Sequence, residues 1–151
     1  MPPSNLDEDQ QLSLKLFVIL SKAYKTIMDK ALKDMKNYRL SASEFAVLEV
    51  LYMKGSIALQ QIGDKILISS GSITYNIDKL EQKGLLRRVP AKDDRRVIYA
   101  EITAAGTALF DRIFPQHAAR IHDLMSGLTD ERKQEAIEWL KLLGKGAAEK
   151  G

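Results

Sequence analysis

Between residues 70 and 96 the chain gathers side chains whose chemistry suits recognition of a nucleic acid. A polar helix is expected over 70–83, and its outward positions are Ser70, Ser72, Thr74, Tyr75, Asn76 and Lys79. Hydroxyls donate and accept hydrogen bonds, an asparagine amide pairs with adenine, and a lysine binds guanine or phosphate. N–H groups at a helix start add a phosphate site. The set predicts a helix that enters the DNA major groove. An ordinary solvated face with capping serines is the alternative, and the helix alone does not decide.

A charged hairpin is expected to follow this helix. Gly84 stops the helix, strand-like sequence occupies 85–89 and 97–102, and the loop between them is basic. Asp94 and Arg96 are two residues apart, so the carboxylate can hold the guanidinium in one orientation. Such an arginine suits the negative potential of a narrow minor groove. An isolated charged hairpin is usually an exposed turn of little energetic weight. The order of helix, glycine stop and charged hairpin favours DNA binding.

The excess positive charge of the chain lies in the same region. Of 151 residues, 23 are Lys or Arg and 20 are Asp or Glu, a net charge of +3. The window 69–96 holds seven basic and four acidic residues and carries that whole excess. Contacts to phosphate are therefore expected from this window. The candidate DNA-binding set is completed by Arg88, Lys92, Asp94, Arg95 and Arg96.

A long helix is expected before these elements, over about 9–36. Its apolar residues step by three and four, and the resulting stripe is wider than one packing partner needs. Such a helix usually lies between its own domain and a second subunit. Ser41 and Glu44 fit a capping box that starts the next helix, which Gly55 ends. A short helix over 59–66 then precedes the polar helix, and together they make a helix-turn-helix.

Two helices are expected after the hairpin. Thr103 can cap a helix over 104–126 that is kinked or restarted near Pro115. Thr129 can cap a last helix that ends at Gly144. The predicted fold is mainly α with a small β-wing, in one domain over 1–151. It places a winged helix-turn-helix at 41–103 between dimerisation helices at 9–36 and 104–145.

Composition excludes several other classes of protein. A content of 45% hydrophobic and 28% charged residues is typical of a globular domain and too apolar for a disordered chain. No apolar run approaches the length of a membrane span. The acidic, polar N-terminus is the opposite of a secretory signal, so we expect a cytoplasmic protein without membrane contact. The chain has no cysteine, which excludes disulfides, thiolate metal sites and sensing by thiol oxidation.

The two histidines do not predict a metal site or a catalytic set. His117 and His122 are five residues apart, so on a helix they project about 140° apart and cannot bind one ion as an i, i+4 pair does. No serine or glutamate is spaced to complete a nucleophile and base. We therefore expect no enzyme, no cofactor and no metal. His117 is expected to pack or to form a hydrogen bond between helices.

The ordered motifs over 41–106 resemble the winged helix-turn-helix of the MarR family of bacterial regulators, and the flanks resemble its MhqR-like branch. The matching segments are Ser41-x-x-Glu-Phe-x-x-Leu, Leu59-Gln-Gln-Ile62, Ser72-Ile-Thr74, Asp78-Lys-Leu-Glu-Gln-Lys-Gly84-Leu-Leu-x-Arg88, Asp94-Arg-Arg96, Ile102-Thr-x-x-Gly106, LKLFVILSKAY and FPQHAARIHDLMSGL. The resemblance implies that the terminal helices form a dimer and that Arg96 is the wing-tip arginine. It also implies base-contacting positions at Ser72, Thr74, Tyr75 and Asn76.

The resemblance also bears on a ligand. The MhqR-like branch is associated with repressing genes for detoxifying quinones, hydroquinones or catechols, and in this chain without cysteine it implies a noncovalent effector or none. The family places small-molecule pockets between the first helix, the wing domain and the helix after the wing. The candidates here are Phe17, Tyr24, Tyr52 and His117. For each of them an ordinary place in an aromatic core is the alternative.

Three hypotheses follow. The leading one is a homodimeric repressor that binds a pseudo-palindromic operator in double-stranded DNA and is released by a small phenolic or quinone-like effector. In that case Arg96→Ala weakens binding to many sequences, and Asn76→Ala loses discrimination at one position of each half-site. The second is a winged-helix protein-interaction module without operator binding. The third is a small-molecule binder or enzyme with a vestigial wing. The operator, the effector, repression versus activation, and the DNA competence of the free dimer stay open.

Overall fold

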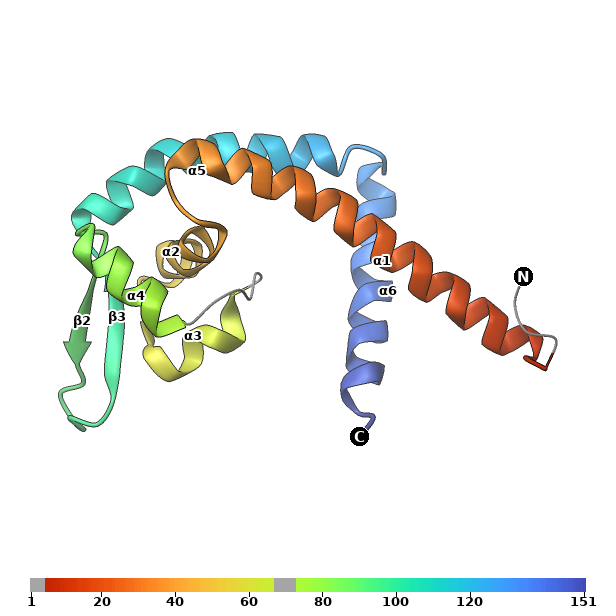
Figure 1. Ribbon diagram of the computed structural model, residues 1–151, viewed down its shortest axis with the longest axis horizontal. Coiled ribbons are helices and arrows are strands. Elements are labelled where there is room, and N and C mark those ends of the chain that lie inside the picture. Colours follow the sequence, from red (N-terminus) through yellow and green to blue (C-terminus); the bar gives the residue numbers. More distant parts are fainter. Residues whose placement is uncertain (1–4, 67–72) are drawn as a thin grey trace. The chain divides into compact units, whose positions relative to one another are not determined.

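The computed structural model describes residues 5–66 and 73–151 (Figure 1). The chain falls into two compact units, one up to His117 and one from Ala118. The elements are α1 (Glu8–Met35), the 3₁₀ helix η1 (Lys36–Tyr38), α2 (Ala42–Lys54), β1 (Ser56–Ala58), α3 (Leu59–Lys65), α4 (Ile73–Gln82), β2 (Leu86–Pro90), β3 (Ile98–Ile102), α5 (Ala104–Leu124) and α6 (Asp130–Ala148). The predicted class, mainly helical with a small β-wing, is confirmed.

The helix starts are set by the side chains that the sequence indicated. At α2, Ser41 Oγ accepts from the Glu44 N–H at 3.1 Å, and the Glu44 carboxylate accepts from the Ser41 N–H at 3.0 Å. At α5, Thr103 Oγ1 accepts from the Gly106 N–H at 3.0 Å and donates to the Gly84 carbonyl at 2.6 Å. The second bond joins the start of α5 to the end of α4. Thr129 caps α6 by accepting from the Arg132 N–H.

The sheet has three antiparallel strands in the order β1-β3-β2, one more strand than the sequence predicted. Ile57 of β1 lies opposite Ala100, and Leu86 of β2 lies opposite Ile102. The strand β1 was missed because three residues are too few to show an alternating pattern. Its pairing with β3 attaches the wing to the start of α3, so the hairpin does not rest on α4 alone.

Two predicted helix features needed correction. The last helix does not end at Gly144 but continues to Ala148. One glycine costs a helix interior only about 1 kcal/mol relative to alanine, and the alanines that follow favour continuation. Of the two alternatives predicted at Pro115, a kink or a restart of the helix, the restart is wrong, since that proline lies inside the continuous helix α5.

The core of the first unit is built around α2. The largest fully buried side chains are Phe45, Val47, Leu48, Leu51, Ile62, Ile77, Leu80, Leu86 and Phe110. They come from α2, α3, α4, β2 and α5, and each contributes about 1.5–3 kcal/mol by burial. Ile62 of α3 and Ile77 and Leu80 of α4 are the side chains by which the two helices of the helix-turn-helix enter this core.

Two helices leave large apolar side chains in solvent. On α1 these are Leu12, Leu14, Leu16, Phe17, Val18, Ile19, Leu20 and Tyr24. On α6 they are Ile137, Trp139, Leu140, Leu142 and Leu143. Contiguous exposed apolar faces of this kind mark interaction sites, because a lone soluble chain gains nothing by exposing them.

Candidate nucleic-acid interface

The helix α4 presents a polar face outward and a core face inward. Thr74, Tyr75 and Lys79 are exposed, as the sequence predicted, while Ile77 and Leu80 are buried. The Lys79 Nζ lies 5.5 Å from the centroid of the Tyr75 ring, within the range of a cation–π contact. Ser70 and Ser72, together with the expected serine cap of this helix, lie outside the described residues.

The outward placement of Asn76 was wrong. Its side chain is only 6% exposed. Residue 76 precedes Ile77 and stands four positions before Leu80, which places it within the inward stripe of the helix. Because asparagine is polar, the apolar periodicity of the sequence did not mark residue 76 as an inward position. The expectation that Asn76→Ala alters discrimination at one base pair therefore no longer stands, because the side chain does not lie on the outward face.

Arg88 was expected to contact DNA, but its guanidinium is held by two carboxylates of α4. Nη2 donates to Asp78 Oδ1 and Nη1 to Glu81 Oε1, both at 2.6 Å, and the Arg88 N–H donates to Glu81 Oε2 at 3.2 Å. The side chain is 28% exposed. Charge-assisted hydrogen bonds to both carboxylates neutralise it for phosphate binding. Arg88 therefore fastens β2 to the recognition helix.

The wing tip carries the accessible positive charge. Lys92, Arg95 and Arg96 are exposed, and 91% of the Arg96 side chain is accessible. Asp94 Oδ1 accepts from the Arg96 N–H at 3.0 Å and from Nε at 3.1 Å, and Oδ2 accepts from Nη2 at 3.3 Å. The hydrogen bonds from Arg96 lower the pKa of Asp94 below its ordinary value. The predicted pre-oriented arginine is confirmed.

The four candidate pocket residues do not form one site within the described parts of the chain. Tyr52 and His117 both contact the Phe114 ring, at centroid distances of 5.4 and 6.0 Å. Phe17 and Tyr24 are 68% and 60% exposed on α1 and make no ring contact with that cluster. A pocket lined by all four stays a prediction, because the apolar face of α1 that carries Phe17 and Tyr24 is exposed in the single chain.

Beside the ring cluster of Tyr52, Phe114 and His117 the structure has a groove that the sequence did not predict. It has a volume of about 310 Å³ and is lined by Glu49, Val50, Met53, Lys54, Lys65 and Phe114. His117 Nε2 lies 3.4 Å from Glu49 Oε2 and its ring is 4.7 Å from Phe45, which confirms the expected packing between helices. The lining residues come from α2, α3 and α5, so no local pattern could have indicated the groove.

The described residues contain neither a candidate metal site nor a candidate membrane-spanning helix. Over 5–66 and 73–151, no three histidine or acidic side chains are grouped so as to hold a metal ion. In the same residues, no helix combines the length and apolar character needed to cross a bilayer.

Removing the Arg88 guanidinium is expected to destabilise the fold and leave the salt dependence of DNA binding unchanged. Arg88→Met loses two short ion pairs to α4 and should lower the free energy of unfolding by about 1–2 kcal/mol. Urea denaturation measures this change. The matched variant Arg87→Met loses a single ion pair, to Glu101 at 2.6 Å, in which the arginine is more exposed than Arg88. This variant should lower the free energy of unfolding by less than about 0.5 kcal/mol. Equal losses in the two variants would contradict the fastening role.

Comparison with known proteins identifies the family. The MarR family model matches residues 40–98. The HTH-type transcriptional regulator MhqR of Bacillus subtilis (strain 168) is 53% identical over 135 residues, covering 89% of this chain and 93% of that relative. The chain belongs to the MarR family. A second relative, the uncharacterised HTH-type transcriptional regulator YkoM of the same strain, is 38% identical, and the match covers 91% of this chain and 90% of that relative.

Solved structures of MarR-family regulators share the fold. AbsC from Streptomyces coelicolor superposes with a TM-score of 0.80 at 18% identity, covering 98% of this chain and 100% of its own. Sco3205 of the same organism, solved in complex with DNA, gives 0.76 at 18% identity and covers 96% and 91%. These likenesses confirm the winged helix-turn-helix architecture. Because this chain belongs to the MarR family and its relatives MhqR and YkoM are named as transcriptional regulators, the chain is a regulator and not an enzyme.

Proposed function

We propose that this MarR-family regulator is a homodimeric repressor that binds a pseudo-palindromic operator in double-stranded DNA. The observation that carries the proposal is the pairing of two exposed features on one unit. The helix α4 offers Thr74, Tyr75 and Lys79, and the adjoining wing offers Arg96 held in a fixed orientation by Asp94. A helix of this kind fits a major groove, and a fixed arginine on a hairpin tip fits the neighbouring minor groove.

The contacts divide into two kinds. Lys92 and Arg95 are exposed at the wing and supply charge for phosphate, which sets affinity and its dependence on salt. Thr74 and Tyr75 carry the groups that meet base edges, so they supply sequence preference. The fold is shared with Sco3205, whose structure contains DNA, and this supports the proposed mode of binding.

A second copy of the chain is the proposed partner of the apolar faces. Exposed leucines and aromatic residues run along α1 and α6, where the family resemblance implies a dimer. A two-fold dimer presents two α4 helices about 34 Å apart, one turn of B-DNA, and so requires two inverted half-sites.

A small phenolic or quinone-like compound is the proposed effector. The chain has no thiol for covalent sensing, so this ligand would bind noncovalently. The groove of about 310 Å³ that Phe114 and Val50 line has the size and apolar character for a single aromatic ring. Release of DNA requires that the effector bind more tightly to the dimer that cannot hold the operator.

The test is fluorescence anisotropy with the duplex upstream of the gene and a shuffled duplex, across a salt series. The wild-type protein should prefer the native duplex by about a thousandfold or more. Arg96→Ala should weaken operator binding about tenfold and reduce the salt slope by about 1. Arg112→Ala removes the same charge from an exposed position on α5 and should leave the affinity within about twofold.

The alternative function predicts a different result. Equal, weak binding to native and shuffled duplexes, unaffected by Arg96→Ala, would contradict the operator proposal. It would favour a winged-helix module that binds another protein, for which a stable hetero-complex should then be recovered from cell extract.

A further inference from the structure

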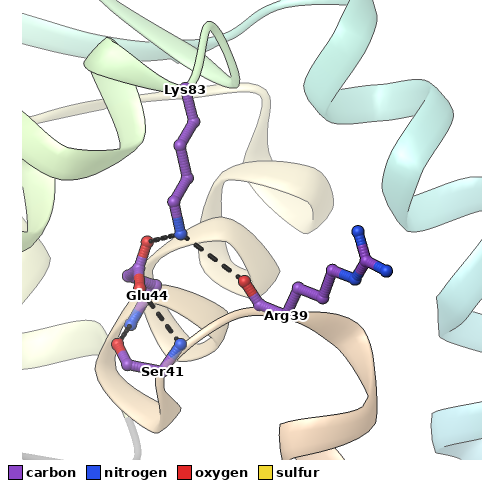
Figure 2. A network of polar contacts seen from close by, with 4 residues as sticks. All are labelled: Arg39, Ser41, Glu44 and Lys83. Carbon is purple, nitrogen blue, oxygen red and sulfur yellow. Dashed lines mark hydrogen bonds and ion pairs between the residues drawn. The ribbon is translucent and has the colours of Figure 1, made fainter.

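Lys83, at the end of α4, reaches back to the start of α2 (Figure 2). Its Nζ donates to Glu44 Oε2 at 2.6 Å and to the Arg39 carbonyl at 3.5 Å. The other carboxylate oxygen of Glu44 accepts from the Ser41 N–H at 3.0 Å. Lys83 and Glu44 are 39 residues apart in sequence, so this contact joins two distant elements.

The backbone that carries Lys83 is fixed. Gly84 has a φ of 75°, the Leu85 N–H donates to the Leu80 carbonyl at 3.0 Å, and the Gly84 N–H donates to the Glu81 carbonyl at 2.9 Å. This is a Schellman motif with Lys83 as its C-cap. The lysine side chain therefore leaves α4 from a defined point, so its contact with Glu44 ties the end of α4 to the start of α2.

The other end of the contact is the junction between α1 and α2. Arg39 has a φ of 59°, a left-handed conformation that reverses the chain between η1 and α2. Tyr38 stacks on Phe45 of α2 with ring centroids 5.9 Å apart, and its hydroxyl donates to Asp34 of α1 at 2.9 Å. The end of α1, the reversed turn and the start of α2 are thus held together.

The ion pair is partly removed from water. Glu44 is 8% exposed as a residue, whereas 41% of the Lys83 side chain is accessible. Burial alone would raise the pKa of Glu44, but the hydrogen bonds from Lys83 and Ser41 outweigh it and the pKa is lowered. A carboxylate held ionised inside the fold needs its cation, so breaking this pair is costly to the local structure.

We propose that Glu44 and Lys83 are positioning residues for DNA recognition, whose ion pair makes the recognition helix follow the α1–α2 junction. The proposal rests on the function proposed above, in which α4 enters the major groove and α1 contributes to the dimer. In such a dimer, the Glu44–Lys83 ion pair would make the distance between the two α4 helices depend on how the α1 helices are arranged. Lys83 then acts through Glu44 and not as a phosphate contact.

The two roles of Lys83 predict opposite signs for one substitution. Glu44→Gln removes a negative charge from a DNA-binding protein, so an ordinary phosphate-contacting Lys83 would be freed and operator binding would tighten. If Glu44 positions α4, the same substitution weakens binding. The glutamine carbonyl can still accept from the Ser41 N–H, so the capping box is kept.

The experiment has a first stage without DNA. Hydrogen exchange is compared for the full-length wild type, Lys83→Met, Glu44→Gln and the control Glu101→Gln, which removes the same charge as Glu44→Gln but from the Arg87 pair in the sheet. Lys83→Met should speed exchange at the end of α4 and also at residues 39–41. Faster exchange confined to α4, with residues 39–41 unchanged, would overturn the link.

In the second stage the same proteins bind the operator duplex in a salt series. Glu44→Gln and Lys83→Met should each weaken binding about tenfold, with the salt slope of the wild type. The double variant should lose no more than either single one, because both break the same link. Lys83→Arg should bind the operator with the affinity of the wild type, and Glu101→Gln should not weaken binding. Melting temperatures of all variants separate these effects from unfolding.

The outcomes distinguish the two proposals. Tighter binding by Glu44→Gln, or a salt slope lowered by about 1 in Lys83→Met, would make Lys83 a phosphate contact and overturn the positioning role. A wild type without preference for any operator would defeat the proposed function instead. In that case the exchange result alone decides whether the link exists.

Discussion

Replacing Gly106 with alanine is expected to lower the free energy of unfolding by about 3 kcal/mol. An added Cβ would overlap the Leu85 carbonyl oxygen and lie 2.8 Å from Ile102 Cγ1. The obstacle is backbone, and that backbone is held in place. The Leu85 carbonyl accepts from the Thr103 N–H at 3.1 Å, and the neighbouring Gly84 carbonyl accepts from the Thr103 hydroxyl at 2.6 Å. Relief would require α5 to move away from the base of the wing.

Chemical denaturation followed by circular dichroism measures this loss. Gly127→Ala is the control, because Gly127 lies in a turn where an added Cβ meets no atom within 4 Å. Its unfolding free energy should change by less than about 0.5 kcal/mol. Gly106→Ala should also weaken operator binding at temperatures where it stays folded, since Thr103 joins the end of α4 to α5. A Gly106→Ala protein as stable as the control would show that the contact relaxes freely.

Local signals in the sequence were enough to predict most elements. The capping box at Ser41, the glycine stops at 55 and 84, and the pairing of Asp94 with Arg96 all depend on residues within four positions of each other. Their physical causes are local, so the spacing of residue types determines them. The structure confirmed each one with a hydrogen bond or a positive φ.

The sequence could not predict which side chains of distant elements pair with one another. The charge count over 69–96 included Lys83 and Arg88 without their partners, whereas Glu44 pairs with the first and Asp78 and Glu81 pair with the second. A count of charges cannot tell a paired cation from an accessible one. Tyr52 likewise donates to Asp111, 59 residues away, at 2.7 Å. Arg87 of the same window pairs with Glu101, so the proposed phosphate contacts are limited to Lys79 and the wing tip.

Placing a charge on the exposed face of α1 is expected to abolish the dimer and with it high-affinity DNA binding. Leu16 is 53% exposed, between Leu12 and Leu20 on the same side of the helix. In the proposed dimer it is covered by the second copy, where an unpaired carboxylate is strongly unfavourable. Leu16→Glu should therefore sediment as a monomer. Leu16→Met keeps the volume and apolar character, so it should remain dimeric.

The expected loss of high-affinity DNA binding follows because one dimer binds both half-sites. A dimer that has engaged one half-site binds the second at a high effective concentration, and a monomer loses this gain, roughly a hundredfold or more. Leu16→Glu should keep its helical circular dichroism, because the site is exposed in one chain. With α4 and Arg96 intact, it should retain weak, salt-dependent binding that no longer needs two inverted half-sites. A Leu16→Glu protein that stays dimeric would place the subunit contact away from this face of α1. A monomer that still binds the operator tightly would show that each chain recognises its half-site alone.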